Sequence, residues 1–253
     1  MKKVLMILVM VGLIAGLLVG CSSVTPPPGE GEGEGEGEEE VARVVLVELF
    51  NTDGCAGCAV VEPMLEDIAA DPDYGHDKLV FVEEAGWGPY STSKTSARYK
   101  WYLPIESDRS TPNILINGLN KKYHGDAGVS KAILMTQINA QSNLEAKIKI
   151  TAQRNTEVNS TTVSGTVTNI SSSDLSNLVV TLMTYKDRGE QGFRYSVTSI
   201  STEEIGSLTS AGTYAFSITV DEPDWVINGL HGAVLVQETA SSKKEVLQVL
   251  YVE

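Results

Sequence analysis

The sequence predicts an α/β domain over residues 41–142, followed by an all-β domain over residues 143–253. Two observations predict this order. Before residue 143, apolar runs typical of buried strands alternate with segments that repeat apolar residues at helical spacing. After it, Thr, Ser and Val recur with period two, and Gly, Ser, Asn and Asp separate the short segments, which is typical of strands joined by turns.

The elements of the first domain are expected in the order β-α-β-α-β-β-α. The run "VARVVLVELF" is almost continuously apolar, so we expect a first strand that is buried on both faces. Further strands are expected in "KLVFVEEA", "NILING" and "KKYHG", and helices in "AVVEPMLEDIAADP", "STSKTSARYKWY" and "AGVSKAILMTQINAQ". This order predicts a sheet that begins with parallel strands and ends with antiparallel ones.

The N-terminal residues 1–20 are expected to be a secretory signal, because two lysines precede an apolar run from Val4 to Leu18. The segment "LVGC" resembles the lipobox of bacterial lipoproteins, which implies cleavage before Cys21 and lipidation of that cysteine. An ordinary signal peptide with an unmodified Cys21 is the alternative. Residues 21–40, rich in Pro, Gly and Glu, are expected to be an extended tether. The protein is therefore expected outside the cytoplasm, anchored to a membrane of the cell envelope.

The chain is acidic, with a formal net charge of −14. Nucleic acids and anionic lipid surfaces attract basic proteins, so this charge argues against both as partners. Once Cys21 is assigned to the lipid anchor, two cysteines remain, and disulfides form and persist outside the cytoplasm.

Those two cysteines, Cys55 and Cys58, stand where a helix is expected to begin. Side chains three residues apart share one face of a helix, close enough to bond. The free N–H groups of a helix N-terminus stabilise a thiolate. We therefore expect Cys55 to be the attacking thiol, and Cys58, one turn deeper, to be the resolving thiol.

The strand "VVLVELF", the Cys-x-x-Cys pair and the later "STPNILING" together resemble a thioredoxin-fold oxidoreductase over residues 41–142. With the region around Trp87, they resemble a group of secreted bacterial thioredoxin-like proteins. The first domain is thus expected to have the thioredoxin-like α/β fold.

The resemblance implies roles for Pro112, Thr111 and Glu48, and the residues themselves suggest roles for Trp87, Asp53 and Glu62. Pro112 is expected in the cis form, placing Thr111 beside the sulfurs, where a substrate peptide pairs as an added strand. Most of the aromatic residues between Trp87 and Tyr102 are expected to pack in the fold, and Trp87 is expected to line the substrate groove. Glu48 is expected to relay a proton to Cys58, the alternative being a strand-end glutamate that faces water. Asp53 and Glu62 are expected to oppose a thiolate.

Seven short segments fill the second domain: "LEAKIKITA", "TTVSGTVTN", "NLVVTLMTY", "FRYSVTSI", "TYAFSITV", "HGAVLVQE" and "EVLQVLYV". Their number and spacing predict an immunoglobulin-like β-sandwich. We interpret this domain as a spacer or docking module, whose partner the sequence does not identify.

The sequence therefore predicts a membrane-anchored extracytoplasmic thiol–disulfide oxidoreductase that acts on protein thiols and disulfides without a cofactor. The direction of electron flow is left open. One alternative is a non-catalytic surface lipoprotein in which the cysteines form a structural disulfide and the β-sandwich binds a partner. Another is a copper(I) or zinc site formed by the two cysteines and His124.

Overall fold

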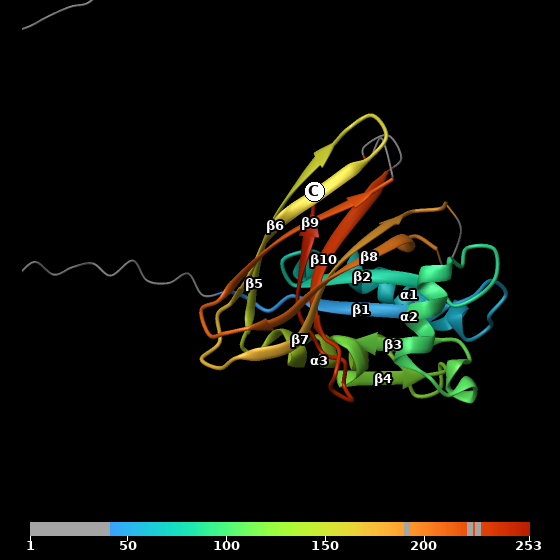
Figure 1. Cartoon of the computed structure of the whole chain (residues 1–253). Helices are drawn as coiled ribbons and strands as arrows, with labels where there is room; N and C mark the ends of the chain where they lie inside the picture. The colour runs from blue at the N-terminus through green and yellow to red at the C-terminus, as the bar shows by residue number, and fades with distance from the viewer. Residues whose placement is uncertain (1–40, 190–192, 222–224, 226–228) are drawn as a thin grey trace, which may run out of the picture. The chain divides into compact units, whose positions relative to one another are not determined.

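A computed structural model describes residues 41–189, 193–221, 225 and 229–253 (Figure 1). The predicted signal sequence, the predicted lipidation site Cys21 and the predicted tether lie outside the described residues. Contacts gather residues 40–253 into one compact unit. Nowhere in the described part of the chain is a helix both long and apolar enough to cross a membrane. Below, the first half means residues 41–142 and the second half residues 143–253.

The described residues form three α-helices and eleven strands. The helices are α1 (Cys58–Ala69), α2 (Ser93–Tyr102) and α3 (Lys131–Ser142), with 3-10 turns at Pro72–Tyr74, Glu106–Arg109 and Gly118–Asn120. The strands are β1 (Val45–Asn51), β2 (Leu79–Ala85), β3 (Asn113–Ile116), β4 (Lys121–His124), β5 (Ile148–Thr156), β6 (Thr161–Asn169), β7 (Leu175–Lys186), β8 (Ser196–Leu208), β9 (Thr213–Val220), β10 (Leu230–Glu238) and β11 (Val246–Val252). Each helix and strand expected from the sequence is present, so the prediction of the elements is confirmed.

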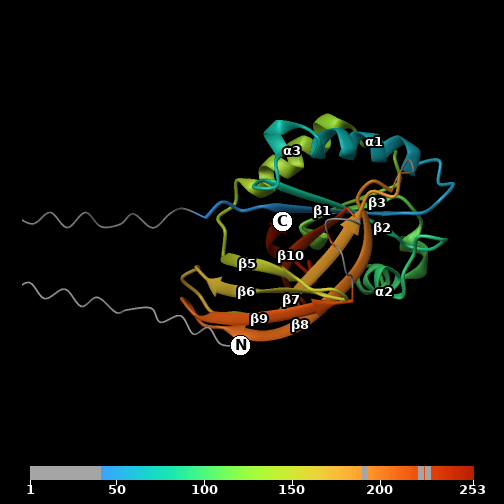
Figure 2. The same ribbon diagram turned by 90° about the horizontal axis from the view of Figure 1, so that it is seen from above.

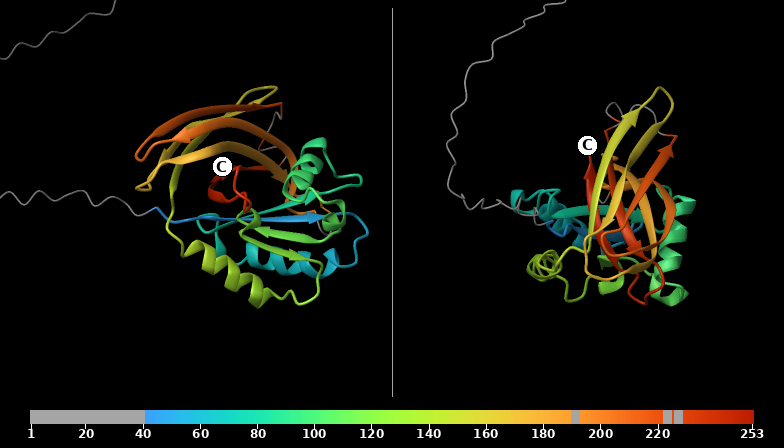
Figure 3. Two further views of the ribbon diagram at one scale, coloured as in Figure 1. Left: turned by 60° about the horizontal axis from the view of Figure 1, so that its bottom comes forward. Right: turned by 60° about the vertical axis from the view of Figure 1, so that its left-hand side comes forward.

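In the described residues, eight strands form a main sheet in the order β11-β10-β7-β8-β2-β1-β3-β4, and β5-β6-β9 form a small sheet. Within the first half, β1 and β2 run parallel, whereas β1 with β3 and β3 with β4 run antiparallel, as expected. The halves join where β8 runs parallel to β2, with Glu83 opposite Ser196. The curvature of the strands of the second half is clearest in Figure 3.

The predicted fold class, an α/β thioredoxin-like domain followed by a separate immunoglobulin-like sandwich, is wrong. The chain is mostly β, and β7, β8, β10 and β11 of the second half belong to the same main sheet as β1–β4. The error has a physical cause: period two shows which residues of a strand face a core, but not which strand lies beside it. The domain boundary at residue 142 itself stays a prediction.

The described residues form four apolar cores, and three of them lie in successive layers. Figure 2 shows α1 and α3 on one side with the small sheet on the other. The first core lies between these helices and β1–β3, and includes Val47, Leu65, Ile114 and Leu134. The second joins the halves, with Leu46 and Val82 against Met183 and Leu235. The third lies under the small sheet and includes Ile148, Val163, Val180 and Val234. Strand β1 is therefore buried on both faces along its length, as its apolar sequence predicts.

A buried polar group, which we call the Arg98 cluster, comprises Arg98, Glu48, Glu84, Tyr102 and Gln237. The Arg98 Nε lies 2.6 Å from Oε1 of Glu48, and the Tyr102 hydroxyl donates to Oε2 of Glu48 at 2.8 Å. Arg98 also donates to the side-chain oxygen of Gln237 on β10 at 3.2 Å. Burial, and then the Glu48 carboxylate, hold the pKa of Glu84 well above its usual value. The Arg98 Nε also lies 3.4 Å from Oε1 of Glu84, so one guanidinium faces two carboxyls, of which Glu84 is the one shifted toward its neutral form. The cluster ties α2, β1, β2 and β10 together.

Glu83 lies at the junction of β2 and β8. Its backbone N–H donates to the Tyr195 carbonyl at 2.8 Å, and its side chain accepts the Tyr195 N–H at 2.7 Å. Burial raises the pKa of Glu83 to about 8, although the hydrogen bond from the Tyr195 backbone opposes this. A buried carboxyl at this seam is thus most stable when it carries its proton.

The Arg98 cluster predicts that Arg98→Met destabilises the protein by about 3 kcal/mol or more, because Glu48 is left buried without its cation. Urea unfolding gives the free energy of unfolding. Lys94→Met, at an exposed position of the same helix, is the matched control and should change it by less than about 0.5 kcal/mol. Equal stability of Arg98→Met and the native protein would contradict the importance of the pair.

Glu83 predicts a decline of stability with rising pH. Its pKa is higher in the folded protein, at about 8, than the ordinary value of 4.5, so folding takes up a proton between these values. The contribution is fully present below pH 4.5 and lost as the pH rises through about 8. Between about pH 5 and about pH 8.5, the unfolding free energy should therefore fall less in Glu83→Gln than in the native protein. The exposed Glu157→Gln should behave like the native protein, and identical slopes in all three would refute the assignment.

Candidate functional site

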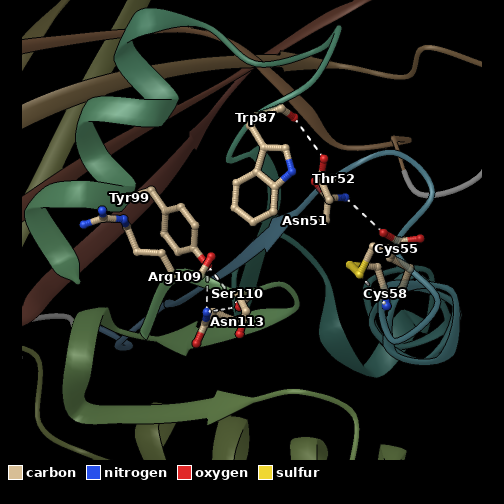
Figure 4. The surroundings of a disulfide bond; sticks show 10 residues. Asn51, Thr52, Cys55, Cys58, Trp87, Tyr99, Arg109, Ser110 and Asn113 are labelled. Atoms are coloured by element: carbon tan, nitrogen blue, oxygen red, sulfur yellow. Dashed lines mark hydrogen bonds between the residues drawn. A yellow bond between two sulfur atoms is a disulfide. The ribbon is translucent and has the colours of Figure 1, made fainter. Parts of the chain in front are cut away.

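Cys55 and Cys58 form a disulfide with their Cα atoms 5.2 Å apart, which confirms that their spacing allows a bond. Cys58 is the first residue of α1 and is 1% exposed, whereas Cys55, in the turn before the helix, is half-buried. Both cysteines line a cavity of about 250 Å³, together with Thr52, Asp53, Gly54, Ala56, Ala59, Glu62 and Phe193. The disulfide, which Figure 4 draws, thus borders an open cavity, and Cys55 is the more accessible of its two residues.

A backbone donor at the N-terminus of α1 contacts the disulfide. The Cys58 N–H donates to Sγ of Cys55 at 3.1 Å. Gly57 is the N-cap residue, and no side chain caps this end of the helix. Uncapped N–H groups carry the positive end of the helix dipole. This charge stabilises a thiolate formed at Cys55 when the disulfide opens.

Pro112 packs against the turn between the cysteines. The Thr111–Pro112 peptide bond is cis, which confirms the prediction. A Cβ atom built on Gly57 would lie 3.0 Å from Cδ of Pro112 and 3.5 Å from Oδ1 of Asp126. A side chain at position 57 would therefore crowd Pro112, and the Ala-Gly spacer lets the two segments meet. Thr111, the residue before Pro112, is half-buried.

A hydrogen-bonded brace holds the segment that ends at Pro112. His124 contacts Ser110 Oγ through Nε2 at 3.0 Å and Asn113 Oδ1 through Nδ1 at 3.1 Å. The Asn113 amide also donates to the Ser110 carbonyl at 2.6 Å and to the Tyr99 hydroxyl at 2.7 Å. The Ser110 carbonyl can only accept, so the Asn113 atom that contacts it is the amide nitrogen, and the Asn113 amide oxygen faces His124. Because that oxygen also only accepts, the Nδ1 of His124 carries the proton of this hydrogen bond. Both ring nitrogens of His124 thus serve this brace.

Glu48 lies on the face of β1 opposite the disulfide. Neighbouring Val47 and Leu49 pack into the core beneath α1, and successive strand residues point to opposite faces. Glu48 accordingly points toward α2, where Arg98 and Tyr102 hold its carboxylate. The structure does not bring the predicted proton relay into the cavity that the cysteines line.

Glu62 is the acid that the structure places in the cavity. It follows Cys58 by one helical turn, is 5% exposed, and accepts a hydrogen bond from the Asn51 amide at 3.1 Å. Burial raises the pKa of Glu62, the Asn51 bond lowers it, and Glu66 raises it further. A carboxyl with a raised pKa can hold and transfer a proton closer to neutral pH. The sequence signal was the four-residue spacing from Cys58, which places both side chains on one helix face.

Trp87 is joined through its backbone to Thr52, a residue that lines the cavity. Its carbonyl accepts a hydrogen bond from the Thr52 hydroxyl at 3.1 Å. Its ring stacks on Tyr99 with the centroids 6.3 Å apart, yet the residue remains 46% exposed (Figure 4). An indole that is held in place and exposed is suited to contact a bound molecule.

No curated protein matches the chain significantly. Among solved structures, HBP35 of Porphyromonas gingivalis is similar, with a TM-score of 0.64 and 11% identity over 82% of this chain and 74% of that chain. Protein AGR_C_4864 from Agrobacterium tumefaciens has a TM-score of 0.53 and 16% identity over 83% of this chain and 94% of that chain. At these identities the likeness concerns the fold alone.

These comparisons correct the family assignment made from the motifs, since neither structure is named as a thioredoxin-like oxidoreductase. The motifs behind that resemblance are short and confined to residues 41–142. The family model that matches the chain covers residues 46–237 and so runs through both halves. An activity can no longer be taken from the resemblance, and only the residues of the site support one. The chain belongs to the family described as "Protein of unknown function (DUF1223)".

Proposed function

We propose that this protein exchanges disulfides with the thiols of other proteins through the Cys55–Cys58 bond, outside the cytoplasm and anchored to a membrane by Cys21. One observation carries the proposal: the disulfide borders an open cavity, with one cysteine accessible and the other buried beside a buried carboxyl. The signal and lipobox patterns of the sequence support the location.

The exchange has two balanced steps. A client thiolate attacks Sγ of Cys55, the Cys55–Cys58 bond breaks, and a mixed disulfide forms while Cys58 leaves as a thiolate. A second client thiolate then attacks the client sulfur of the mixed disulfide, which releases Cys55 and leaves the client with a new disulfide. Two electrons pass from the client to the protein, and the released sulfurs take up the two protons that the client thiols lost. The reverse sequence reduces a client disulfide.

A purely structural role suits this bond poorly. In the loop-closure model, a disulfide that closes so short a loop contributes only about 2 kcal/mol to stability. The residues around it are the ends of β1 and α1, which the apolar core beneath them already holds. Exposure of the cysteine that precedes the helix adds nothing to stability, but it is what an attacking thiolate needs.

Glu62 supplies the proton for the buried sulfur. Burial favours its neutral form, and it lies one turn from Cys58 in the same cavity. When Cys58 departs as a thiolate, the neutral carboxyl can give up its proton, and in the reverse direction the carboxylate can take it back. Glu48 keeps a structural role in the Arg98 cluster under this proposal.

Equilibration of the full-length chain with glutathione redox buffers tests the exchange. Reversible conversion between disulfide and dithiol, followed as a mass shift after alkylation of free thiols, is the expected result. Cys58→Ser should capture client proteins as mixed disulfides on Cys55, whereas the matched Cys55→Ser should capture far fewer. If the glutathione buffers do not reduce the disulfide in the folded protein, and no client is captured, the proposal is wrong. The alternative of a non-catalytic lipoprotein then remains.

The pH dependence of the rate separates Glu62 from Glu48. With a dithiol as the reductant, and rates expressed per thiolate, the native rate should fall as the pH rises through the raised pKa of Glu62. Glu62→Gln should abolish this inflection and lower the rate at acid pH by about 100-fold. Glu48→Gln should keep the inflection. The opposite pattern, with the inflection lost only in Glu48→Gln, would restore the prediction made from the sequence.

A further inference from the structure

We propose that Ser110 is the nucleophile of a second site, which takes acyl groups from carboxylic esters. In this site His124 is the general base, and Asn113 is the residue that orients the base. The site goes beyond the exchange of disulfides and does not depend on it. None of its three residues lines the cavity beside the cysteines.

Ser110, His124 and Asn113 are hydrogen-bonded in the order that activates a serine hydroxyl. The Asn113 amide oxygen accepts the proton on Nδ1 of His124 at 3.1 Å, so Nε2 is the nitrogen without a proton in the neutral ring. Nε2 lies 3.0 Å from Oγ of Ser110, and the hydroxyl therefore donates to it. A hydroxyl within reach of a base, with the base oriented by a third group, is the arrangement used for nucleophilic attack in acyl transfer.

The orienting residue is fixed by its surroundings, whereas the nucleophile and its base are open to solvent. Asn113, the first residue of β3, is 0% exposed. Its amide nitrogen donates to the Tyr99 hydroxyl and to the Ser110 carbonyl (Figure 4). His124 ends β4 and lies opposite Asn113 in the antiparallel pair. Ser110 and His124 are both exposed, so the fold positions the base while the hydroxyl stays accessible to a substrate.

Thr111 offers a backbone donor for the negative charge that develops on the ester oxygen. In hydrolases whose serine lies on a sharp turn, the N–H of the residue after the nucleophile binds this oxygen. Thr111 follows Ser110, and among the described residues its N–H has no hydrogen-bond partner. This N–H is therefore free to donate to a bound ester.

The reaction has two balanced steps. Oγ of Ser110 attacks the ester carbonyl while its proton passes to Nε2 of His124, which then protonates the departing alcohol. This step leaves an acyl ester on Ser110. In the second step, His124 takes a proton from water as the water oxygen attacks the acyl carbon, and it returns that proton to Oγ as the carboxylic acid leaves. The sum is hydrolysis of the ester, with no electrons exchanged.

A fluorophosphonate and an activated ester, para-nitrophenyl acetate, test the site. Both are applied to the full-length chain with its disulfide intact and any free thiol alkylated, so that sulfur does not contribute. Fluorophosphonates bond to serine hydroxyls that a neighbouring base activates. We expect one phosphonate per chain, located at Ser110 by peptide mass spectrometry. We also expect release of para-nitrophenol that this labelling blocks.

Variants with matched controls assign the roles. Ser110→Ala should abolish the labelling, whereas Ser107→Ala, at an exposed position of the 3-10 turn just before it, should keep it. His124→Gln should lower the labelling rate by about 100-fold or more, because the base is lost. His76→Gln, at another exposed histidine, should leave the rate unchanged.

A native chain that takes no phosphonate at Ser110, or takes it at another residue, would overturn the inference, and this result does not depend on the folding of any variant. Equal labelling rates in His124→Gln and the native protein would also overturn it, because the serine would then react without its base. Labelling without release of para-nitrophenol would exclude esters as the substrates. Failure of the disulfide exchange would leave this inference intact.

Discussion

An ion pair buried between β1 and α2, Glu48 with Arg98, fixes how the two halves of the chain meet. Its nitrogen–oxygen distance is 2.6 Å, and the guanidinium reaches across to Gln237 on β10. Charges removed from water are costly unless they are paired and hydrogen-bonded. The second half must therefore pack against β1 and α2 in the arrangement that satisfies Arg98. This requirement helps to select one arrangement of the two halves, which apolar contacts alone would specify less sharply.

The two faces of β1 consequently have different tasks. One face carries Glu48 and joins the two halves. The other face packs against α1, which begins at Cys58 of the disulfide. Under the proposed exchange, a proton-transferring acid for Cys58 has to come from the side of α1. Glu62 meets that condition, because four residues along a helix return a side chain to the same face.

The sequence predicted local structure well and assembly poorly. Apolar patterns identified α1, α3, the four strands of the first half and the seven of the second, since each pattern reflects the buried side of one element. A Ser or Thr cap identified α2. The joining of β8 to β2 depends on Glu83, whose sequence neighbours give no sign of a partner more than a hundred residues away. The position of Glu48 was predicted as a strand residue, but its direction was not, because its partner Arg98 is fifty residues away.

At the site, the cysteine pair and the cis-proline were predictable from short motifs, and the brace through His124 was not. That brace depends on Ser110 and Asn113 meeting a strand that follows a turn, so its spacing has no recognisable period. Family membership was the least predictable feature. The motifs that suggested a family occupy one half, whereas the family to which the chain belongs is defined across both.

The central claim is that one sulfur of the pair can be reached in the folded protein while the other is protected. Timed alkylation of the fully reduced, folded chain, with the modified cysteine identified by peptide mass spectrometry, measures this directly. The account predicts modification at Cys55 first, with Cys58 reacting only much later or after unfolding. Equal rates at the two cysteines, or faster modification of Cys58, would contradict it.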